Sequence, residues 1–355
     1  MTHNIAIIAG DGIGPEVVDE GLKVLRTAAE IFGFDYKTTD HPFGAEHYLK
    51  TGETMPESVI TELRDMDAIL LGAIGDPRIE VGLLEREIIA GIRFKLDLFV
   101  NLRPIKCPAD HVCPIKDKKA TDIDFIVVRE NTEGAYVQMG GNFKEGTPQE
   151  VAVAEMIYTR FGVERVIRYA FELARTRPRK QLTLCDKANA IRPQDLWTRT
   201  FAEVGKEYPD ITTDHAYVDA ACMWMIKNPE AFDTIVTTNL FGDIITDLGS
   251  VLQGGMGVAA SGNIHPGQVS MFEPIHGSAP KYKGQGRANP IATIAATAMM
   301  LDHLGEVDAS QAINQVIEDL IVTQRIPDLS SRSAQSTSEI GDMISKELSE
   351  IAARS

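Results

Sequence analysis

The chain has 355 residues, 44% hydrophobic and 24% charged, which is ordinary for a globular protein large enough for two domains or one large α/β unit. The net charge of −16 argues against a nucleic-acid partner. No run reaches the roughly 18 apolar residues of a membrane-spanning helix, and no basic leader precedes the first apolar run, so we expect a cytoplasmic protein. Four sparse cysteines are expected to be free thiols: Cys107, Cys113, Cys185 and Cys222.

Short apolar runs alternate with longer helical patterns along the chain, which is typical of a mostly parallel sheet covered by helices. No linker rich in Pro, Gly or Ser divides the chain. If the protein has two domains, we therefore expect the chain to pass between them more than once. The predicted strands cover residues 5–9, 68–71, 99–102, 125–128, 182–184 and 234–237. The predicted helices cover residues 16–31, 83–94, 163–175, 194–204, 240–252, 291–304, 310–322 and 338–353.

The first motif is Gly10-Asp11-Gly12-Ile13-Gly14-Pro15-Glu16, which follows the first predicted strand and opens a helix at its proline. Its glycine spacing is G-x-G-x-G, whereas dinucleotide-binding Rossmann folds have G-x-G-x-x-G. The motif therefore predicts a tight strand-to-helix turn that lines a cleft, with a Rossmann site as the weaker alternative.

Three arginines stand at the ends of predicted elements: Arg93, Arg103 and Arg129. Arginine binds carboxylates through two parallel hydrogen bonds, so three of them could hold a small dicarboxylate, although each alone could be a surface ion pair. Tyr136 and Lys187 are candidates for acid–base chemistry, because nearby cations lower the pKa of a Tyr or Lys. The alternative for both is a structural role.

Asp243 and Asp247 lie four residues apart in an apolar segment, and a helix over residues 240–252 would place both carboxylates on one face. Carboxylates without neighbouring Cys or His suit Mg²⁺ or Mn²⁺ better than zinc. Asp219, in another apolar run, is a possible further ligand. The alternative is a helix whose aspartates are simply solvated.

Two irregular segments complete the pattern. Residues 136–149 contain Gly140-Gly141-Asn142 and few core residues, which predicts a protruding arm. Residues 273–280 read E-P-I-H-G-S-A-P, a loop whose backbone N–H groups could meet a phosphate or could form a simple turn.

Taken together and in this order, six segments resemble those of the β-decarboxylating dehydrogenases, the isocitrate/isopropylmalate dehydrogenase family, over essentially the whole chain. The resemblance implies a two-domain α/β fold with a large mixed sheet flanked by helices, not a true Rossmann fold. It implies a first domain of residues 1–99 and 255–355 and a second of residues 100–254, with an arm at about 136–155. The segments are G-D-G-I-G-P-E, N-L-R-P, R-E-N-T-E-G, D-K-A-N, N-L-F-G-D-I-I-T-D and E-P-I-H-G-S-A-P.

The same resemblance implies the reaction and a homodimer with shared active sites. The three arginines bind the carboxylates of a 2-hydroxy acid, Lys187 accepts its hydroxyl proton, and Tyr136 protonates the enolate left by loss of CO₂. Asp243 and Asp247 hold Mg²⁺ or Mn²⁺ with the partner subunit's Asp219, and Lys187 also comes from the partner. The residues expected to bind the nicotinamide cofactor are Ile13, Glu273, His276, Gly277, Ser278, Ala279, Lys281, Tyr282, Asn289 and Asp328.

Family members share a malate core and differ in the pocket for its C3 substituent, expected here at Ile89, Ala90, Asn189 and Ala190. Apolar Ile89 and Ala90 suit an alkyl group, which favours 3-isopropylmalate, converted to 4-methyl-2-oxopentanoate and CO₂ in leucine biosynthesis. Ala190 stands where isopropylmalate enzymes typically have Val, a loss of roughly 1 kcal/mol or more of apolar contact. Tartrate, D-malate, another 3-alkylmalate and isocitrate therefore remain alternatives.

The cofactor loop departs from NAD-dependent relatives, which usually have Asp-Ile where this chain has Lys281-Tyr282. The pair resembles NADP-dependent isocitrate dehydrogenases, in which a cation and a phenol meet the 2′-phosphate. Other NADP-type contacts do not clearly recur at Pro327 and Ser331, although Arg332 could substitute, so NAD and NADP both remain open. A catalytically silent regulatory homologue is the alternative of a different class, and the complete set of expected catalytic residues argues against it.

Overall fold

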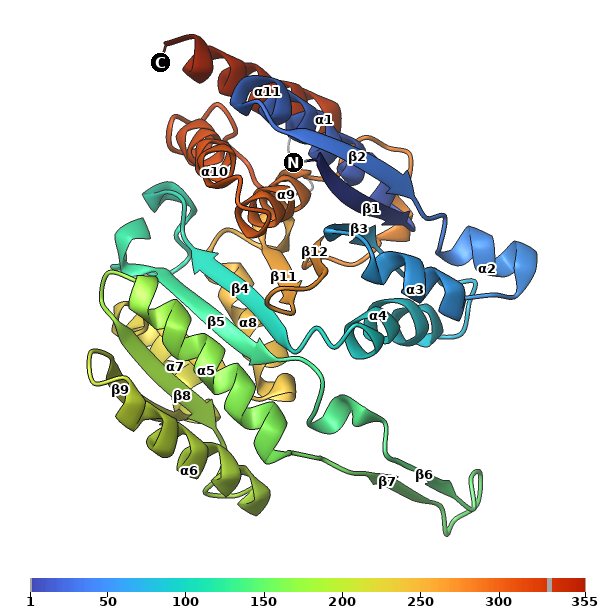
Figure 1. The fold of residues 1–355 in the computed structure, drawn as a ribbon, viewed down its shortest axis with the longest axis vertical. Coiled ribbons are helices and arrows are strands. Elements are labelled where there is room, and N and C mark those ends of the chain that lie inside the picture. The colour runs from blue at the N-terminus through green and yellow to red at the C-terminus, as the bar shows by residue number, and fades with distance from the viewer. Residues whose placement is uncertain (1, 331–333, 355) are drawn as a thin grey trace. The chain divides into compact units, whose positions relative to one another are not determined.

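The computed structural model describes residues 2–330 and 334–354 of the chain. The chain divides into two compact units (Figure 1). Unit 1 contains Met1–Leu98, Arg103–Ile123 and Ser250–Ser355, and unit 2 contains Phe99–Leu102 and Asp124–Gly249. The chain thus passes between the units more than once, in agreement with the absence of a single linker in the sequence.

Unit 1 is a sheet with helices packed on both faces. Its strand order is β2-β1-β3-β12-β11, and the neighbours are parallel except β11 and β12, which are antiparallel. The strands are β1 (Thr2–Gly10), β2 (Asp35–Asp40), β3 (Ala68–Ala73), β11 (Ala260–Ile264) and β12 (Ser270–Pro274). The helices are α1 (Gly14–Phe32), α2 (Ala45–Thr51), α3 (Glu57–Arg64), α4 (Gly91–Lys95), α9 (Ile291–His303), α10 (Val307–Val322) and α11 (Thr337–Arg354).

The core of unit 1 lies on both sides of its sheet, because successive side chains of a strand point to opposite faces. In β1, Ile5 and Ile7 are buried in one apolar cluster with residues of α1, α9, α10 and α11. Ala6 and Ile8 are buried in a second cluster with residues of α3 and α4. Strands that are apolar on both faces are typical of sheets covered by helices on each side, and the predicted mixed α/β class is confirmed.

Unit 2 contains four parallel strands in the order β5-β10-β8-β9 and a separate antiparallel hairpin. The hairpin strands are exposed throughout and lie where the sequence predicts an arm. The strands are β5 (Asp124–Glu130), β8 (Gln181–Asp186), β9 (Thr212–Tyr217) and β10 (Thr234–Thr237), with β6 (Gly140–Phe143) and β7 (Val151–Ala154) in the hairpin. The helices are α5 (Arg160–Thr176), α6 (Asp195–Val204), α7 (Val218–Lys227) and α8 (Asn239–Leu252).

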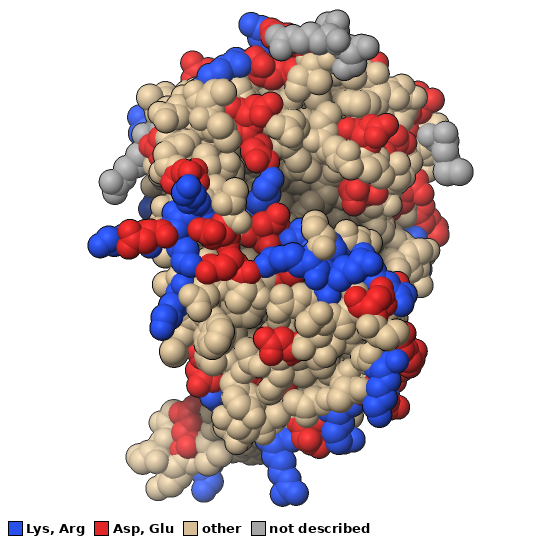
Figure 2. All heavy atoms as spheres, turned by 90° about the vertical axis from the view of Figure 1, so that its left-hand side faces the viewer, with Lys and Arg blue, Asp and Glu red and all other residues tan. Residues whose placement is uncertain are grey.

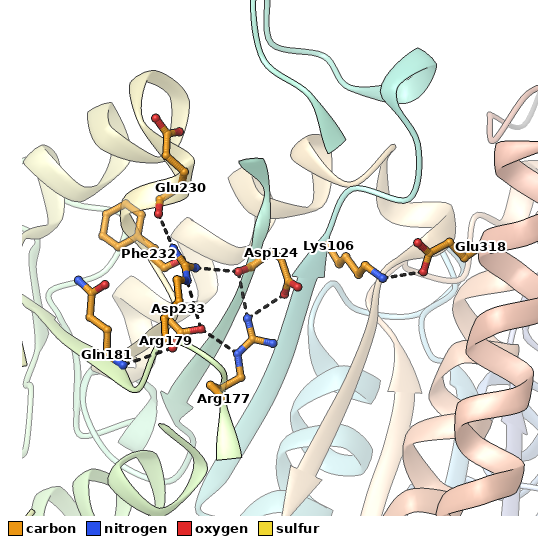
Figure 3. Close-up of polar contacts among 9 residues, drawn as sticks. All are labelled: Lys106, Asp124, Arg177, Arg179, Gln181, Glu230, Phe232, Asp233 and Glu318. Atoms are coloured by element: carbon orange, nitrogen blue, oxygen red, sulfur yellow. Dashed lines mark hydrogen bonds and ion pairs between the residues drawn. The ribbon is translucent and has the colours of Figure 1, made fainter. Parts of the chain in front are cut away.

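The connection from β4 (Val100–Lys106) to β5 differs from the expected domain assignment, because Arg103–Ile123 belongs to unit 1. Ala109 of this connection is buried in the first apolar cluster of unit 1. Lys106 Nζ lies 2.6 Å from Glu318 Oε2 of α10 (Figure 3). These contacts fasten the connection to unit 1, and they join residues too far apart in sequence to be seen in a motif.

The segment before Arg93 is helical as predicted, but its first part is not an α-helix. Glu85–Ala90 forms a π-helix, which has one more residue per hydrogen-bonded turn than an α-helix, and α4 follows it directly. Within it Ile88 is fully buried, whereas Ile89 and Ala90 are half-buried. Ile89 packs partly against the second apolar cluster, so only part of its side chain is free to line a substrate pocket.

Asp233, just before β10, is the centre of a buried ionic network in unit 2 (Figure 3). Its carboxylate accepts hydrogen bonds from Arg177 Nε at 3.0 Å and from the Gln181 N–H at 3.3 Å. Arg177 also donates to Asp124 Oδ1 at 2.8 Å, and Arg179 donates to three backbone oxygens nearby. The network fastens together the starts of β5, β8 and β10.

Replacing Asp233 with asparagine is expected to lower the free energy of unfolding by about 3 kcal/mol, because the largely buried Arg177 and the more exposed Arg179 then face a neutral amide in place of a fully buried carboxylate. The matched control is Asp195→Asn. Asp195 lies 2.6 Å from Arg199, but their side chains are 59% and 64% exposed. Losing this pair should therefore cost at most about 1 kcal/mol. Urea unfolding measures both variants, and equal losses would contradict a special role for the buried network.

The surface of the molecule carries charges of both signs. Figure 2 shows Lys and Arg side chains interspersed with Asp and Glu over one face. Basic groups are therefore available at the surface despite the net charge of −16. In the part of the chain that the structure describes, no helix is both long enough and apolar enough to cross a membrane.

Candidate active site

Arg129, which is 2% exposed, is the centre of a polar cluster at the end of β5. Its Nε and Nη2 donate to Asn239 Oδ1 at 3.1 and 2.8 Å, and its Nη1 donates to Asp243 Oδ1. Tyr136 Oη donates to the other oxygen of Asp243 at 3.0 Å, and its ring centre lies 5.5 Å from the guanidinium carbon. An arginine, a phenol and a carboxylate from three segments of unit 2 therefore meet at one point.

Gly242 allows α8 to approach Arg129 this closely. A Cβ atom at this position would lie 2.4 Å from Arg129 Cγ, much closer than two non-bonded carbon atoms can approach. The same turn of α8 carries Asn239, whose Nδ2 donates to the backbone oxygen of Glu133 at 3.1 Å. Glycine is thus required here so that α8 can present both Asn239 and Asp243 to the arginine.

The three predicted metal ligands separate into a pair and a single residue. Asp243 and Asp247 lie one turn apart on α8, as their spacing predicts, with Asp243 half-buried and Asp247 exposed. Asp219 lies in the first turn of α7. Among residues 2–330 and 334–354, no three His, Cys, Asp or Glu side chains are close enough to hold one metal ion. The three aspartates therefore do not form one metal site within the described residues of a single chain.

Lys187 lies in the turn after β8, and the fully buried Gln194 holds this turn. Gln194 Oε1 accepts a hydrogen bond from the Lys187 backbone N–H at 2.7 Å, and Gln194 Nε2 donates to Tyr158 Oη at 2.9 Å. Lys187 Nζ donates to Asp219 Oδ1 at 2.5 Å, which lowers the pKa of that carboxyl group. The structure therefore pairs Lys187 with Asp219, the two residues that the resemblance assigns to the partner's contribution.

Glu130, the residue after Arg129, is a buried carboxyl group that holds the next turn. Its oxygens accept hydrogen bonds from the Thr132 N–H at 2.7 Å, the Thr132 hydroxyl at 2.9 Å and the Glu133 N–H at 2.9 Å. Burial raises the pKa of Glu130 from 4.5 to about 7. The side chain therefore changes its charge near neutral pH, directly beside the arginine cluster.

This shift predicts a pH-dependent stability of unit 2. The folded protein holds the Glu130 proton up to about pH 7, whereas the unfolded chain releases it near pH 4.5, so the contribution of Glu130 to folding is greatest below about pH 4.5 and is lost as the pH rises to about 7. The stability of the wild type relative to Glu130→Gln should therefore fall by up to roughly 3 kcal/mol as the pH rises through this window. Urea unfolding of both proteins across the window measures the difference, and a constant difference would exclude titration of Glu130.

In unit 1, Arg93 of α4 pairs with Glu273 of β12. Arg93 Nη2 donates to Glu273 Oε1 at 2.7 Å, and Asn263 Nδ2 donates to the same oxygen at 2.7 Å. Glu273 is 5% exposed, so its carboxylate is buried between these two donors. Arg103 of β4 is also buried, at 5% exposure. Glu273, expected from the resemblance to serve the cofactor, thus orients a predicted substrate-binding arginine.

The loop after β12 is locked to the G-D-G-I-G-P-E turn. The Ile13 N–H donates to the Ser278 backbone oxygen at 2.8 Å, and a Cβ atom on Gly12 would lie 1.9 Å from that oxygen. Ser278 Oγ donates to the Gly75 backbone oxygen at 2.6 Å, and Asp11 Oδ2 accepts the Gly75 N–H at 3.0 Å. The predicted tight turn is confirmed, and it holds the loop for which the sequence leaves open a phosphate contact or a simple turn.

The groups of this loop are suited to a nucleotide. His276 Nε2 is buried and has no hydrogen-bond partner among the described residues, and burial lowers the pKa of His276, so a neutral imidazole is available. Lys281 Nζ lies 4.8 Å from the centre of the Tyr282 ring. A pocket of about 480 Å³ is lined by Ser278 to Lys281 together with residues of the segment 75–85.

Two other expected cofactor residues hold neighbouring backbone in unit 1. Asn289 Oδ1 accepts the Ile291 N–H at 3.0 Å, and its Nδ2 donates to the Leu329 backbone oxygen at 3.1 Å. Asp328 Oδ1 accepts the Ser330 N–H at 2.8 Å. Asn289 therefore joins the start of α9 to the segment that carries Asp328.

Residues 4–344 match the isocitrate/isopropylmalate dehydrogenase family. The chain belongs to this family. The 3-isopropylmalate dehydrogenase of Thermobifida fusca is 48% identical to this chain over 356 residues, and the match covers 98% of each protein. The 3-isopropylmalate dehydrogenase of Beutenbergia cavernae is 47% identical over 349 residues, and the match covers 97% of this chain and 98% of that protein. The solved isocitrate dehydrogenase of Methylococcus capsulatus has a TM-score of 0.87 at 36% identity and covers 98% of this chain and 99% of its own. The solved β-decarboxylating dehydrogenase of Thermococcus kodakarensis has a TM-score of 0.79 at 32% identity, and the match covers 99% of this chain and 97% of that one.

Membership in the isocitrate/isopropylmalate dehydrogenase family confirms the resemblance and the fold expected from it. The chain is a dehydrogenase, and its family implies a divalent metal and a nicotinamide cofactor. The exposed Asn189 and Ala190 follow Lys187 in its turn, as the D-K-A-N segment requires. Ser331 and Arg332, considered for NADP, lie outside the described residues.

Sequence reasoning missed several residues that position the site of this dehydrogenase. Asn239 opens the N-L-F-G-D motif and could have been noticed as a polar side chain one turn before Asp243. Gln194 and Asn263 carry no such signal, because they act on residues that only the fold brings near. The missed residues thus bind predicted site residues and hold them in place.

Proposed function

We propose that this chain catalyses the oxidative decarboxylation of 3-isopropylmalate to 4-methyl-2-oxopentanoate and CO₂, in leucine biosynthesis and in the cytoplasm. The observation that carries the proposal is the contact of Arg129 and Tyr136 with the two oxygens of Asp243, which joins a carboxylate binder, a proton donor and a metal ligand. The names of relatives that are 47–48% identical over nearly the whole chain support the substrate.

The residues have distinct roles in this reaction. Arg93, Arg103 and Arg129 bind the two carboxylates of the substrate through charge-assisted hydrogen bonds. Lys187 accepts the proton of the C2 hydroxyl group, and Tyr136 donates a proton to the carbon that loses CO₂. When bound, the cation stabilises negative charge on the C2 oxygen and the nicotinamide accepts the hydride.

The aspartates fit a hard divalent cation. Asp219, Asp243 and Asp247 offer only carboxylate oxygens, which suit Mg²⁺ or Mn²⁺. Asp243 and Asp247 share one face of α8, and Asp219 faces Lys187 at 2.5 Å in a different part of unit 2. We therefore assign the third carboxylate to the partner subunit's Asp219.

Exposed apolar side chains on two separate elements of unit 2 support a homodimer. On α7, Met223 is 66% exposed and Trp224 is 50% exposed, and on the hairpin arm Phe143 and Val151 are 61% and 52% exposed. Large apolar side chains exposed on one helix and one hairpin are typical of protein–protein interfaces. Asp219 lies in the first turn of the same helix. A second copy of the chain that packs on α7 would therefore lie close to Asp219 and to Lys187, which contacts Asp219 within the same chain.

A substrate comparison tests the function. With Mg²⁺ or Mn²⁺ present, kcat/KM is expected to be highest for 3-isopropylmalate among 3-isopropylmalate, D-malate, tartrate and isocitrate. The half-buried Ile89 and Ala90 favour an alkyl group, whereas Ala190 leaves room for a larger one. A highest value for another acid would replace the proposed substrate. Binding of these acids without any reduction of a nicotinamide would indicate a silent homologue.

The charge of the cofactor loop favours NADP. Residues 277–290 contain Lys281, Lys283 and Arg287 and no Asp or Glu. A phosphate on the ribose is attracted to such a loop, whereas ribose hydroxyl groups are better held by a carboxylate. The ratio of kcat/KM for NADP to that for NAD is therefore expected to exceed one, and a ratio well below one would assign the enzyme to NAD.

A further inference from the structure

Glu16 has no role in the reaction described above, yet its side chain binds the backbone of the loop that carries Lys281 and Tyr282. It lies in the first turn of α1, at the end of the G-D-G-I-G-P-E motif. One carboxylate oxygen accepts the Gly284 N–H, and the other accepts the Gly286 N–H at 3.0 Å. One ionic side chain therefore holds two backbone groups that lie two residues apart.

The backbone of this segment has a conformation that needs such support. Gly284 and Gly286 have φ angles of +72° and +59°, a region that glycine enters freely and other residues rarely adopt. Glycine also gives the unfolded or loosened loop the greatest choice of conformations, so fixing it requires strong contacts. Hydrogen bonds from N–H groups to a carboxylate are about twice as strong as those between neutral groups.

A second anchor holds the opposite side of the same segment. The Thr337 N–H donates to the Gly286 backbone oxygen at 2.8 Å, and the Thr337 hydroxyl donates to the Ala288 backbone oxygen at 2.7 Å. The carbonyl groups of the loop are thus held by the start of α11, and two of its N–H groups by the start of α1. Removing Glu16 would free one side of the loop and leave the other attached.

The position of Glu16 couples this loop to the G-D-G-I-G-P-E turn at two points. The Ile13 N–H holds the Ser278 oxygen before Lys281, and Glu16 holds Gly284 and Gly286 after it. The segment that carries the cationic and phenolic side chains is therefore fixed at both ends, by the residue before α1 and by the first turn of α1.

We infer that Glu16 is a positioning residue for the dinucleotide: it fixes the backbone after Lys281 and Tyr282 so that these side chains are held ready for the cofactor. The inference rests on the proposed function, because that function assigns the cofactor to this loop. Glu16 itself does not touch the reacting atoms.

The kinetic test compares Glu16→Gln and Glu16→Ala with the wild type. The KM for the dinucleotide is expected to rise roughly tenfold in Glu16→Ala, with a smaller rise in Glu16→Gln, which keeps one amide oxygen as acceptor. The KM for the acid substrate and the unfolding midpoint should stay close to wild type. The matched control is Asp19→Asn, which removes a negative charge from the exposed side of the same helix and should leave both KM values unchanged. Equal increases in both KM values would overturn the assignment.

Limited trypsin digestion tests the loop without requiring activity. Lys281, Lys283 and Arg287 provide cleavage sites within the segment that Glu16 holds. Cleavage there is expected to be faster in Glu16→Ala than in the wild type or Asp19→Asn, and NADP should slow it in the wild type. An unchanged cleavage rate in Glu16→Ala would refute the inference. Faster cleavage of Glu16→Ala without any protection of the wild type by NADP or NAD would support the role of Glu16 in holding the loop, but would show that the loop is not the dinucleotide site.

Discussion

Lys187→Met is expected to reduce kcat by about a hundred- to ten-thousand-fold, because the variant has no group to accept the hydroxyl proton of the substrate. Binding of 3-isopropylmalate in the presence of Mg²⁺ should remain measurable by calorimetry, since the arginines and aspartates are unchanged. Turnover close to wild type would remove Lys187 from the reaction.

Lys187→Arg separates proton transfer from charge pairing. In the structure Lys187 Nζ lies 2.5 Å from Asp219 Oδ1, and an arginine could keep that ion pair. Arginine does not lose its proton in proteins, so it cannot act as the base. We expect Lys187→Arg to be as inactive as Lys187→Met in the oxidation step. Recovery of activity in the arginine variant would mean that Lys187 serves only to hold Asp219.

Buried strands with an unbroken apolar run could be predicted from sequence, because burial on both faces leaves that pattern. β1, β3 and β10 are apolar on both faces, and the helix that carries Asp243 and Asp247, predicted over residues 240–252, spans Asn239–Leu252. β2 and β9 were missed because their sequences, DYKTTD and TTDHAY, are polar and mostly exposed, and each strand stands at the end of its own unit's strand order. β11 and β12 were missed although they are buried throughout, because polar residues and glycine interrupt the apolar pattern of ASGNI and SMFEP.

The candidate site shows a similar division. The residues with distinctive chemistry, such as Arg129, Tyr136 and Asp243, could be recognised from motifs, and the structure brings these three together. The groups that hold site residues in place could not be recognised. The contact of Arg93 with Glu273 joins residues that are 180 positions apart in the sequence, and the contact of Glu16 with Gly284 joins residues that are 268 positions apart. Such contacts are fixed by the topology of the sheet, which no local pattern encodes.

Mixing two inactive variants is expected to restore activity if the site is shared between subunits. Lys187→Met alters the group assigned to the partner, and Asp243→Asn alters the group on the subunit that binds the arginine cluster. A mixed dimer of these two variants has one site with both substitutions and one with neither. After unfolding and refolding an equal mixture, about a quarter of wild-type activity should return, because about half of the dimers are mixed and each has one intact site.

The matched control mixes Lys187→Met with Asp219→Asn. Lys187 and Asp219 contact each other within one chain, so both substitutions fall on the same side of a shared site. Every site in this mixed dimer lacks one group, and no activity should return. Recovery in the first mixture but not in the second would fit a cation held by Asp243 and Asp247 of one subunit and the partner subunit's Asp219.

If neither mixture recovers although mixed dimers are detected by native mass spectrometry, each chain must assemble its site from its own residues. The distance between the α8 aspartates and Asp219 would then have to close by a movement within one chain.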